Sequence, residues 1–452
     1  MRDDTKAARE RQQIRTFRCA FGARRPASLS EVLSVAQLQA LLNGSAGAYR
    51  ERVYSPMVTL DLFVHQVLGR DKACQDAVGR RRAERIRVGQ APCSLSSGPY
   101  CKARQRLPLA LIEQSLLQVG QRLEARMPSG WRWAGRVVKI FDATCLSMPD
   151  TTQNQARWPQ IPGQRPGLGF PQMRVGALIG LASGAVIDYA HCAVQGKAAS
   201  EHTLLRRLRG SLERGDLLLA DALHSTWATL HWAASAGVDV LMPCHGSRRF
   251  SGKKADQRVW WPKPRSRPEY IDPQHWRELP EGIWVREVRV RGRQLVTTLP
   301  ATQATPGQLD VLYKMRWNIE VDFRSMKAGM EMDILRTKTP AMVEKELAAY
   351  LLAYNLVRWT MAQAAWLGQV LPRALSFSMA CRLTGLLHEQ LLHARKGDIT
   401  RIIGLTLAGM ASCQLPHRPG RVEPHAKKRR PRPLPLLMEP RHIARLKIKN
   451  AA

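Results

Sequence analysis

The chain has 452 residues, of which 70 are Lys or Arg and 36 are Asp or Glu, so its formal net charge is +34. So strong a basic excess argues against a small-molecule enzyme and points to a polyanionic partner, with nucleic acid ranked before a membrane surface. The longest apolar run, residues 347–357, is too short to cross a bilayer, and the charged N-terminus shows no secretory segment. Nine scattered cysteines without a CxxC pair indicate reduced thiols and a cytoplasmic location.

The first third of the chain is predicted to be helical and basic. A capping box formed by Ser28 and Glu31 begins a predicted helix that closes at Asn43-Gly44. Further helices are expected at 59–69 and 74–89, followed by a Ser/Gly/Pro-rich loop at 91–108. The amphipathic stretch 109–127 predicts a long helix that leads into the main domain.

The centre of the chain changes to strand-like patterns. A β-rich run at 135–144 ends at Asp142, a hairpin is expected at 173–194, and a buried strand at 216–225 ends at Asp221. A helix capped by Ser200 precedes that last strand, and a helix and a strand follow it. This order predicts an α/β fold with a mixed five-stranded sheet, in which the first and fourth strands lie side by side and bring Asp142 and Asp221 together.

The segment 244–304 is basic, contains Trp and Pro, and is predicted to be a β-rich insertion with a hairpin at 282–301. Helical periodicity resumes at Thr305, which caps a helix with Pro306 at its first position and Gln308 completing the cap. The stretch 343–365 predicts an interior helix, and the Pro-rich cationic end at 418–442 predicts an extended tail that contacts polyanions.

One helix carries an unusual polar line. At 100° per residue, Tyr313, Arg316, Glu320 and Lys327 fall in one sector about 60° wide. A neighbouring apolar stripe should pack on the core, and it contains Met315, Ile319, Phe323 and Met326. A solvated face with an Arg316–Glu320 ion pair is the ordinary interpretation of such a line. Its combination with two strand-borne aspartates favours a functional site instead.

Three carboxylates without a nearby His or Cys form a hard-oxygen site suited to Mg²⁺ or Mn²⁺. Two such ions about 3.5–4 Å apart activate a water or a 3′-hydroxyl in phosphodiester displacement. Arg316 and Lys327 would then clamp phosphates, and Tyr313 would offer its hydroxyl to a phosphate or its ring to a sugar. Two competing aspartates, Asp150 and Asp216, are expected to face solvent, and Asp322 points away from the line.

At these residues the chain resembles bacterial insertion-sequence transposases of the DDE class, in the subgroup with a Tyr-x2-Arg-x3-Glu-x6-Lys signature (the insertion-sequence-four type). The signature stands here with every spacing intact in YKMRWNIEVDFRSMK. The resemblance extends over nearly the whole chain, including PCSLSSGPYCKARQRLP, FDATCLSMPDTTQNQ and GDLLLADALHS. Two departures are that Ala143 stands where relatives commonly have Gly, and Ala222 where many have Arg.

The resemblance implies a ribonuclease-H-like catalytic core with a β-rich insertion, and it implies Asp142, Asp221 and Glu320 as ligands of two Mg²⁺ ions. It further implies nicking of the transposon end, a DNA hairpin intermediate, and strand transfer to target DNA by a homodimer in a synaptic complex, in the cytoplasm beside the bacterial nucleoid. A Trp of the insertion would stack on a flipped base. Trp284 is favoured over Trp260, Trp261 and Trp276, although each alone is more typical of packing.

The N-terminal region would then recognise the terminal inverted repeats. Its arginines expected on DNA phosphates are Arg80, Arg81, Arg82 and Arg85, with Lys102, Arg104 and Arg106 as further candidates. A merely solvated basic face is the alternative, and phosphate contacts do not identify the base-reading residues. His202 and His224, which flank the strand of Asp221, are expected to be structural.

The expected domains are an end-recognition domain at 1–108, a connecting helix at 109–134, a catalytic core at 135–243 and 305–375, an insertion at 244–304, and a C-terminal region at 376–452. Two other functions stay open at this point. A structure-selective nuclease would share the carboxylates without needing the insertion, and a non-catalytic DNA-binding regulator would bind ends without cutting them.

Overall fold

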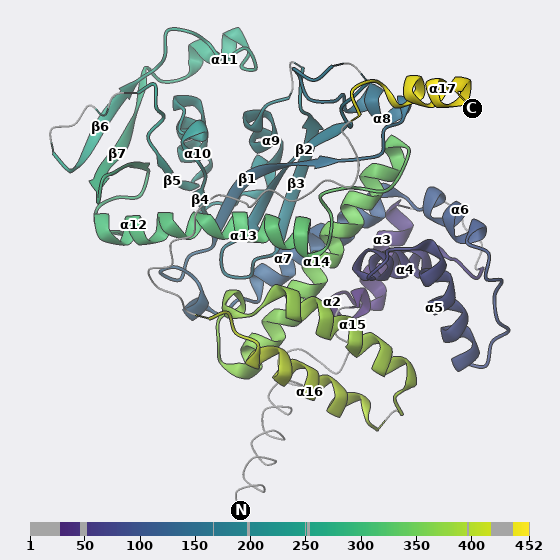
Figure 1. The fold of residues 1–452 in the computed structure, drawn as a ribbon. Helices are drawn as coiled ribbons and strands as arrows, with labels where there is room; N and C mark the ends of the chain where they lie inside the picture. The colour runs from purple at the N-terminus through teal and green to yellow at the C-terminus, as the bar shows by residue number, and fades with distance from the viewer. Residues whose placement is uncertain are drawn as a thin grey trace, which may run out of the picture.

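The computed structural model describes residues 28–45, 52–165, 167–196, 199–248, 250, 254–395, 397–416 and 437–451. An eight-stranded mixed sheet forms its centre, in the order β3-β2-β1-β4-β5-β8-β7-β6 (Figure 1). The strands are β1 (Val138–Ser147), β2 (Gln172–Gly180), β3 (Val186–Ala193), β4 (Leu217–Leu219), β5 (Asp239–Pro243), β6 (Asp256–Pro262), β7 (Gly282–Val290) and β8 (Arg293–Thr297). The predicted α/β class is confirmed.

The strand pairing agrees with the predicted arrangement in its first part and differs in its second. β1 pairs antiparallel with β2 and parallel with β4, so the predicted adjacency of the first and fourth strands is confirmed. The predicted five strands of the core are present as β3-β2-β1-β4-β5, but the sheet does not end there, because β8 of the insertion pairs antiparallel with β5 from Leu241 to Pro243. The insertion thereby extends the same sheet and covers the edge that β5 would otherwise expose.

Helices cover both faces of the sheet (Figure 1). The crossover helices α9 (Glu201–Leu208) and α10 (Trp227–Ala236) connect β3 to β4 and β4 to β5. Leu204 of α9 and the ring of Phe141 on β1 both lie over Gly176, so Phe141 faces α9. Since side chains alternate along a strand, Asp142 faces the opposite side, where α13 (Asn318–Arg324) contacts β1.

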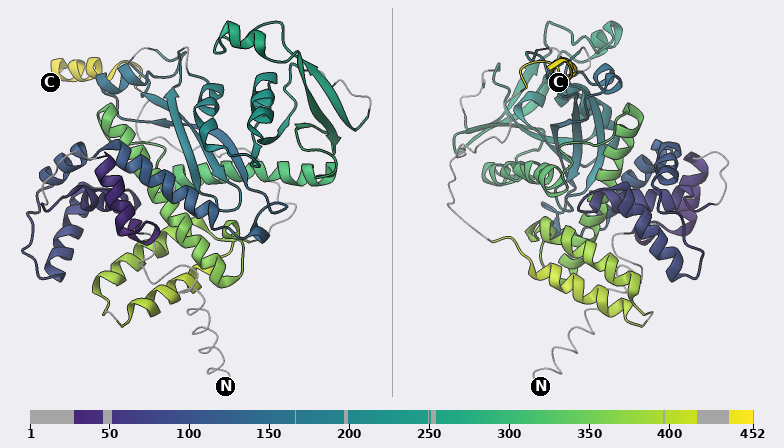
Figure 2. Two further views of the ribbon diagram at one scale, coloured as in Figure 1. Left: turned by 180° about the vertical axis from the view of Figure 1, so that it is seen from behind. Right: turned by 45° about the vertical axis from the view of Figure 1, so that its right-hand side comes forward.

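The N-terminal helices pack together beside the sheet (Figure 2). They are α2 (Leu29–Val32), α3 (Val35–Ser45), α4 (Pro56–Leu68), α5 (Cys74–Arg87), α6 (Gly98–Arg106) and α7 (Leu109–Ala125). The single helix predicted from Ser28 is wrong, since the chain leaves the helix at Leu33 and Ser28 makes no capping bond. The predicted loop at 91–108 contains α6. The long helix predicted at 109–127 is confirmed, and α7 passes so close to β3 that a Cβ at Gly120 would lie 2.1 Å from the Val186 carbonyl oxygen.

The interior helix predicted at 343–365 is confirmed within α14 (Pro340–Gly368), which packs on α7, α4 and α16. The other helices are α8 (Thr152–Arg157), α11 (Pro273–Glu278), α12 (Pro306–Lys314), α15 (Phe377–His393), α16 (Ile399–Ser412) and α17 (Arg441–Ala451). Residues 418–436 of the predicted tail lie outside the described part of the chain, residues 437–440 are not helical, and α17 begins at Arg441. None of the helices in the described ranges has the length and apolar character needed to cross a bilayer.

Candidate active site

Asp142 and Asp221 lie at the same level of two neighbouring parallel strands. The β1–β4 pairing ends with Ile140 opposite Leu219, and each aspartate follows two residues later. β1 itself continues to Ser147, so the prediction that this strand ends at Asp142 is wrong: its pairing with β4 ends at Ile140, two residues earlier. Burial raises the pKa of the Asp142 carboxyl, and the nearby charge of Asp221 raises it further.

A short 3-10 turn over Ala222–His224 follows Asp221 directly. The Asp221 carboxylate caps this turn by accepting a 3.1 Å hydrogen bond from the Leu223 N–H. His224 is buried, its Nε2 lies 3.7 Å from Asp221 Oδ1, and burial lowers its pKa to about 3. A ring held neutral and edge-on to Phe141 at 4.9 Å supports the structural role expected for His224.

The helical segment that carries the signature is not a uniform α-helix. The predicted capping box of Thr305 and Gln308 is present at the start of α12. A 3-10 turn (Met315–Trp317) separates α12 from α13, and a π-helical turn (Ser325–Gly329) follows α13. The assumed constant rotation of 100° per residue is therefore wrong here, since 3-10 turns are tighter and π turns wider. The predicted apolar stripe is buried at its last three positions, but Met315 is 37% exposed.

Arg316 joins the helix to the strand. One terminal nitrogen of its guanidinium donates to Asp142 Oδ2 at 3.0 Å, and the other donates to Glu320 Oε1 at 3.0 Å. Lys327, on the π-helical turn, donates to the Cys145 carbonyl at 3.0 Å and to Thr144 Oγ1 at 3.3 Å, both on β1. The polar line predicted on the helix thus faces β1, and it is not a solvated surface.

The side chains of this cluster shift one another's pKa values and stay partly accessible to solvent. Burial by itself lowers the pKa of Arg316, but Tyr313, Asp142 and Glu320 together raise it above its ordinary value. Burial also raises the pKa of Tyr313, which hydrogen-bonds to Arg316. The exposed side-chain fractions are 22% for Asp142, 34% for Glu320 and 41% for Asp221, so all three carboxylates are partly open to solvent.

A fourth carboxylate, Glu201, belongs to the same neighbourhood and was missed in the sequence. Burial raises the pKa of Glu201, and Asp221 and Asp142 raise it further, so its charge lies close to theirs. Ser200 caps α9 by accepting from the Thr203 N–H, which places Glu201 in the first turn above the strand ends. The predicted cap at Ser200 was the signal in the sequence that could have located Glu201 at the start of the helix before the Asp221 strand.

The competing aspartates have separate structural roles. Asp150 is exposed, as predicted. The prediction that Asp216 faces solvent is wrong, because its side chain is buried and pairs with Lys139 at 2.6 Å on the adjacent strand β1. Asp322 is fully buried between Arg358 and Arg373, directed away from Glu320 as expected.

Residues 133–356, which include all three proposed carboxylates, match the family described as Transposase DDE domain. The chain is also 28% identical over 346 residues to transposase InsG for insertion sequence element IS4 of Escherichia coli K12, covering 73% of this chain and 76% of that protein. The chain is a DDE transposase, and it is similar to the transposase of IS4. A stretch of 63 residues is 35% identical to the transposase for insertion sequence element IS421 of Escherichia coli, covering 14% of this chain and 17% of that protein.

Among solved structures, the piggyBac transposase synaptic complex with hairpin DNA aligns at a TM-score of 0.40 and 9% identity, over 91% of this chain and 87% of that chain. A likeness of that degree supports no conclusion about the fold. Membership of the DDE family makes the transposase a metal-dependent enzyme of DNA cleavage and transposition.

The carboxylates of the transposase fit a divalent metal by donor type. Their hard oxygens lie on β1, after β4 and on α13, and a cationic guanidinium lies between two of them. Within the described residues, no three His, Cys, Asp or Glu side chains are close enough together to hold an ion as they stand. An ion held by Asp142 and Glu320 would take the place that Arg316 occupies between them.

Two of the four candidate tryptophans of the transposase lie on its surface. Trp260 and Trp284 are directly opposite each other on β6 and β7, with ring centroids 5.3 Å apart and 44% and 52% exposed. Trp261 and Trp276 are buried, so only the first two can meet DNA. Arg286, two residues from Trp284 and on the same face of β7, donates to the Ala304 carbonyl just before α12, so Trp284 faces the α12 side of the sheet.

Three of the four candidate arginines of α5 are engaged within the protein. Arg81 donates to the Val53 carbonyl and to Glu84, Arg82 donates to the Cys93 carbonyl, and Arg85 donates to the Ala91 carbonyl and to Gln90. Arg81 thus ties α5 to the segment before α4, and Arg82 and Arg85 tie it to the segment that follows α5. Arg104 stacks over Phe63 and Tyr100, whereas Lys102 and Arg106 are exposed.

Proposed function

We propose that this transposase binds the terminal inverted repeats of its element and catalyses cut-and-paste hydrolysis and strand transfer with Asp142, Asp221 and Glu320. The observation that carries this assignment is the single guanidinium of Arg316, which spans Asp142 and Glu320 beside Asp221. The strand order is β3-β2-β1-β4-β5, in which β1 is antiparallel to β2 and parallel to β4. This arrangement supports a ribonuclease-H-like core.

Each side chain has a distinct task in this proposal. Asp142, Asp221 and Glu320 would hold two Mg²⁺ ions, with Mn²⁺ as a substitute. When bound, such a pair of ions activates a water or a 3′-hydroxyl and stabilises the leaving oxygen. Arg316, released from the carboxylates, binds the phosphate beside the scissile bond through its planar fork of donors. Tyr313 orients Arg316, and Lys327 fixes the helix on β1 or binds a phosphate as a point charge.

The surface around these residues supplies the remaining DNA contacts. Trp284, paired with Trp260 on the α12 side, stacks on a base flipped out during hairpin formation. The N-terminal helices recognise the transposon end, with Arg80 and the exposed Lys102 and Arg106 on phosphates. Arg82 and Arg85 contribute chiefly by holding the segment after α5 in place, and Arg81 by holding the segment before α4.

The larger organisation follows the proposed chemistry. The end-recognition region at 1–108 and the helix at 109–134 precede a catalytic core at 135–243 and 305–375, which the β-rich segment 244–304 interrupts. The C-terminal region at 376–452 adds a basic surface for DNA. Two copies act together, since both transposon ends must be held in one synaptic complex, and the bacterial cytoplasm beside the nucleoid is the expected place of action.

A strand-transfer assay tests the proposed function. The purified protein is incubated with Mg²⁺, a labelled duplex that ends in the inverted repeat flanking its gene, and a supercoiled target plasmid. Joined products support the transposase assignment at this site. Cleavage without joining would indicate a nuclease, and binding without cleavage would indicate a DNA-binding regulator. A duplex with a scrambled repeat controls for end recognition.

A further inference from the structure

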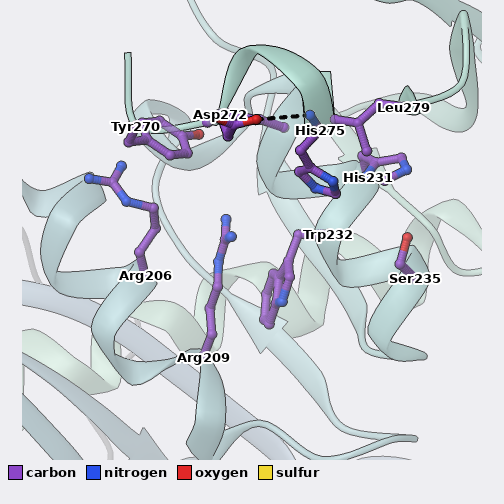
Figure 3. Close-up of a pocket in the computed structure, with 11 residues that line it drawn as sticks. Arg206, Arg209, His231, Trp232, Ser235, Tyr270, Asp272, His275 and Leu279 are labelled. Atoms are coloured by element: carbon purple, nitrogen blue, oxygen red, sulfur yellow. Dashed lines mark hydrogen bonds between the residues drawn. The ribbon is translucent and has the colours of Figure 1, made fainter. Parts of the chain in front are cut away.

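A pocket of about 510 Å³ lies between the end of α9, the outer side of α10 and the segment 270–279 of the insertion (Figure 3). Its size is within the range of small-ligand sites. Arg206 enters it from α9, Arg209 from the 3-10 turn directly after α9, His231 and Trp232 from α10, and Tyr270 and His275 from the insertion. None of these residues belongs to the carboxylate site described above.

Two guanidinium groups in this pocket are stacked on aromatic rings. The guanidinium carbon of Arg206 lies 3.8 Å from the centroid of the Tyr270 ring, and that of Arg209 lies 4.3 Å from the centroid of the Trp232 ring. Figure 3 shows Arg209 between Arg206 and Trp232, directed toward the segment that carries Tyr270 and Asp272. Stacked guanidiniums present flat, cationic layers of the kind that nucleobases and phosphates both contact.

Arg209 has binding capacity that the protein does not use. Its Nε is buried and has no hydrogen-bond partner among the described residues. Burial lowers the pKa of Arg209 to about 10, which still leaves it charged at neutral pH. A buried donor without a partner is costly unless a ligand or water satisfies it, so this nitrogen indicates a missing acceptor.

The one carboxylate of the pocket does not neutralise the arginines through a direct contact. Asp272 Oδ1 caps α11 by accepting from the Gln274 and His275 N–H groups at 2.8 and 3.2 Å. The pocket therefore remains cationic around its aromatic rings. His231, stacked on Trp227 with an interplanar angle of 7°, lines the opposite wall. A small inorganic anion would not contact the aromatic rings of the pocket, and an apolar ligand would not pair with the charges of Arg206 and Arg209.

We propose that this pocket binds a nucleotide, with its base stacked among Trp232, Tyr270 and the guanidiniums and its phosphate on Arg206 and Arg209. The pocket lies near Asp221, since His202, one turn before Arg206 on α9, has its ring centroid 5.2 Å from that of His224, whose Nε2 is 3.7 Å from Asp221. The bound nucleotide could be an unpaired nucleotide of a DNA strand that passes Asp221, and this source rests on the proposed function. A free nucleotide is the other source. The surface of Trp284 is a separate one, because it faces the α12 side of the sheet.

Binding measurements in EDTA test this site without requiring cleavage. The probes are AMP, a duplex with an unpaired end carrying 2-aminopurine, and a blunt duplex of the same paired sequence. Arg209→Met is expected to weaken binding of the unpaired-end duplex about tenfold or more while leaving the blunt duplex nearly unchanged. Arg214→Met, which removes one exposed charge five residues away, should affect both duplexes equally and slightly.

The two sources give different outcomes. A loss confined to the unpaired-end duplex, with weaker quenching of 2-aminopurine, supports the DNA strand. A loss confined to AMP supports a free nucleotide. Equal effects of Arg209→Met and Arg214→Met on every probe would overturn the proposal. If Arg209→Met does not fold, Tyr270→Ala, which truncates a ring that is 46% exposed, is measured in the same way. Glu320→Gln should bind all three probes normally, so a failure of the pocket is distinguishable from a failure of the catalytic assignment.

Discussion

Arg316 donates a 3.0 Å hydrogen bond to Asp142, joining a 3-10 turn at the start of α13 to the central strand β1. The same guanidinium holds Glu320, so a single side chain of the protein contacts both carboxylates. A guanidinium in that position reduces the repulsion between the negative charges of Asp142 and Glu320. It also competes with any divalent cation for the same oxygens.

Removal of this competitor should strengthen metal binding. We expect Arg316→Gln to tighten Mn²⁺ binding by the DNA-free protein about tenfold, which corresponds to about 1.4 kcal/mol. The loss of free Mn²⁺ signal in electron paramagnetic resonance measures this affinity. Arg324→Gln removes an exposed arginine from the same helix and should leave the affinity unchanged. Weaker Mn²⁺ binding by Arg316→Gln would mean that the guanidinium supports the ion site instead of competing for it.

Asp322, two residues from Glu320, should matter for stability and not for metal binding. Its carboxylate is fully buried and pairs with Arg358 and Arg373, so Asp322→Asn leaves two cations without their charge partner. We expect the free energy of unfolding to fall by about 3 kcal/mol in urea titrations. Asp333→Asn, at an exposed position nearby, should change it by less than about 0.5 kcal/mol. Equal effects of the two variants would contradict the structural role of Asp322.

Acid should destabilise the protein through buried histidines. His65 and His388 meet edge-to-face at 4.2 Å, and burial lowers their pKa values to about 4 and about 3. In the unfolded chain each ring regains an ordinary pKa near 6.5. The unfolded state therefore binds more protons between pH 6.5 and 4, and stability conferred by the neutral rings is lost as the pH falls through that window.

Urea titrations at several pH values between 7.5 and 4.5 measure this effect. The double variant His65→Phe/His388→Phe should lose less unfolding free energy over this range than the unchanged protein does. The half-buried His191 and the buried His224, with pKa values lowered to about 4 and about 3, should still produce a residual slope. Identical pH slopes for the variant and the unchanged protein would show that this pair does not titrate on unfolding.

Trp284 should affect DNA binding much more than folding. Its ring is 52% exposed, so Trp284→Ala is expected to change the unfolding free energy by less than about 1 kcal/mol. Loss of base stacking should weaken binding of an end duplex with an unpaired base about tenfold, measured by fluorescence anisotropy. Trp366→Ala, at a 38% exposed tryptophan of α14, serves as the matched control. Unchanged affinity of Trp284→Ala would remove Trp284 from the DNA interface.

The sequence predicted the parts of this fold that depend on local patterns. The cap at Thr305, the hairpin of β2 and β3, and the apolar run within α14 are encoded by neighbouring residues, and the structure has each of them. The adjacency of β1 and β4 was also predicted, because a crossover helix constrains where the next parallel strand lies.

The remaining features depend on contacts between distant segments. The antiparallel pairing of β5 with β8 joins the insertion to the central sheet, and no local pattern specifies that partner. The burial of Asp216 depends on Lys139, 77 residues away in the chain. The 3-10 and π turns around α13 reflect the packing of Arg316 and Lys327 against β1, which a regular helical wheel does not represent.

The most direct test of the account is Mg²⁺-dependent cleavage of an inverted-repeat duplex by Glu320→Gln. The substitution preserves size and removes the charge that we assign to metal binding. The account predicts that cleavage is abolished while the affinity for the same duplex, measured by gel shift, stays nearly unchanged. Retained Mg²⁺-dependent cleavage by this variant would contradict the assignment of Glu320 and with it the proposed three-carboxylate site.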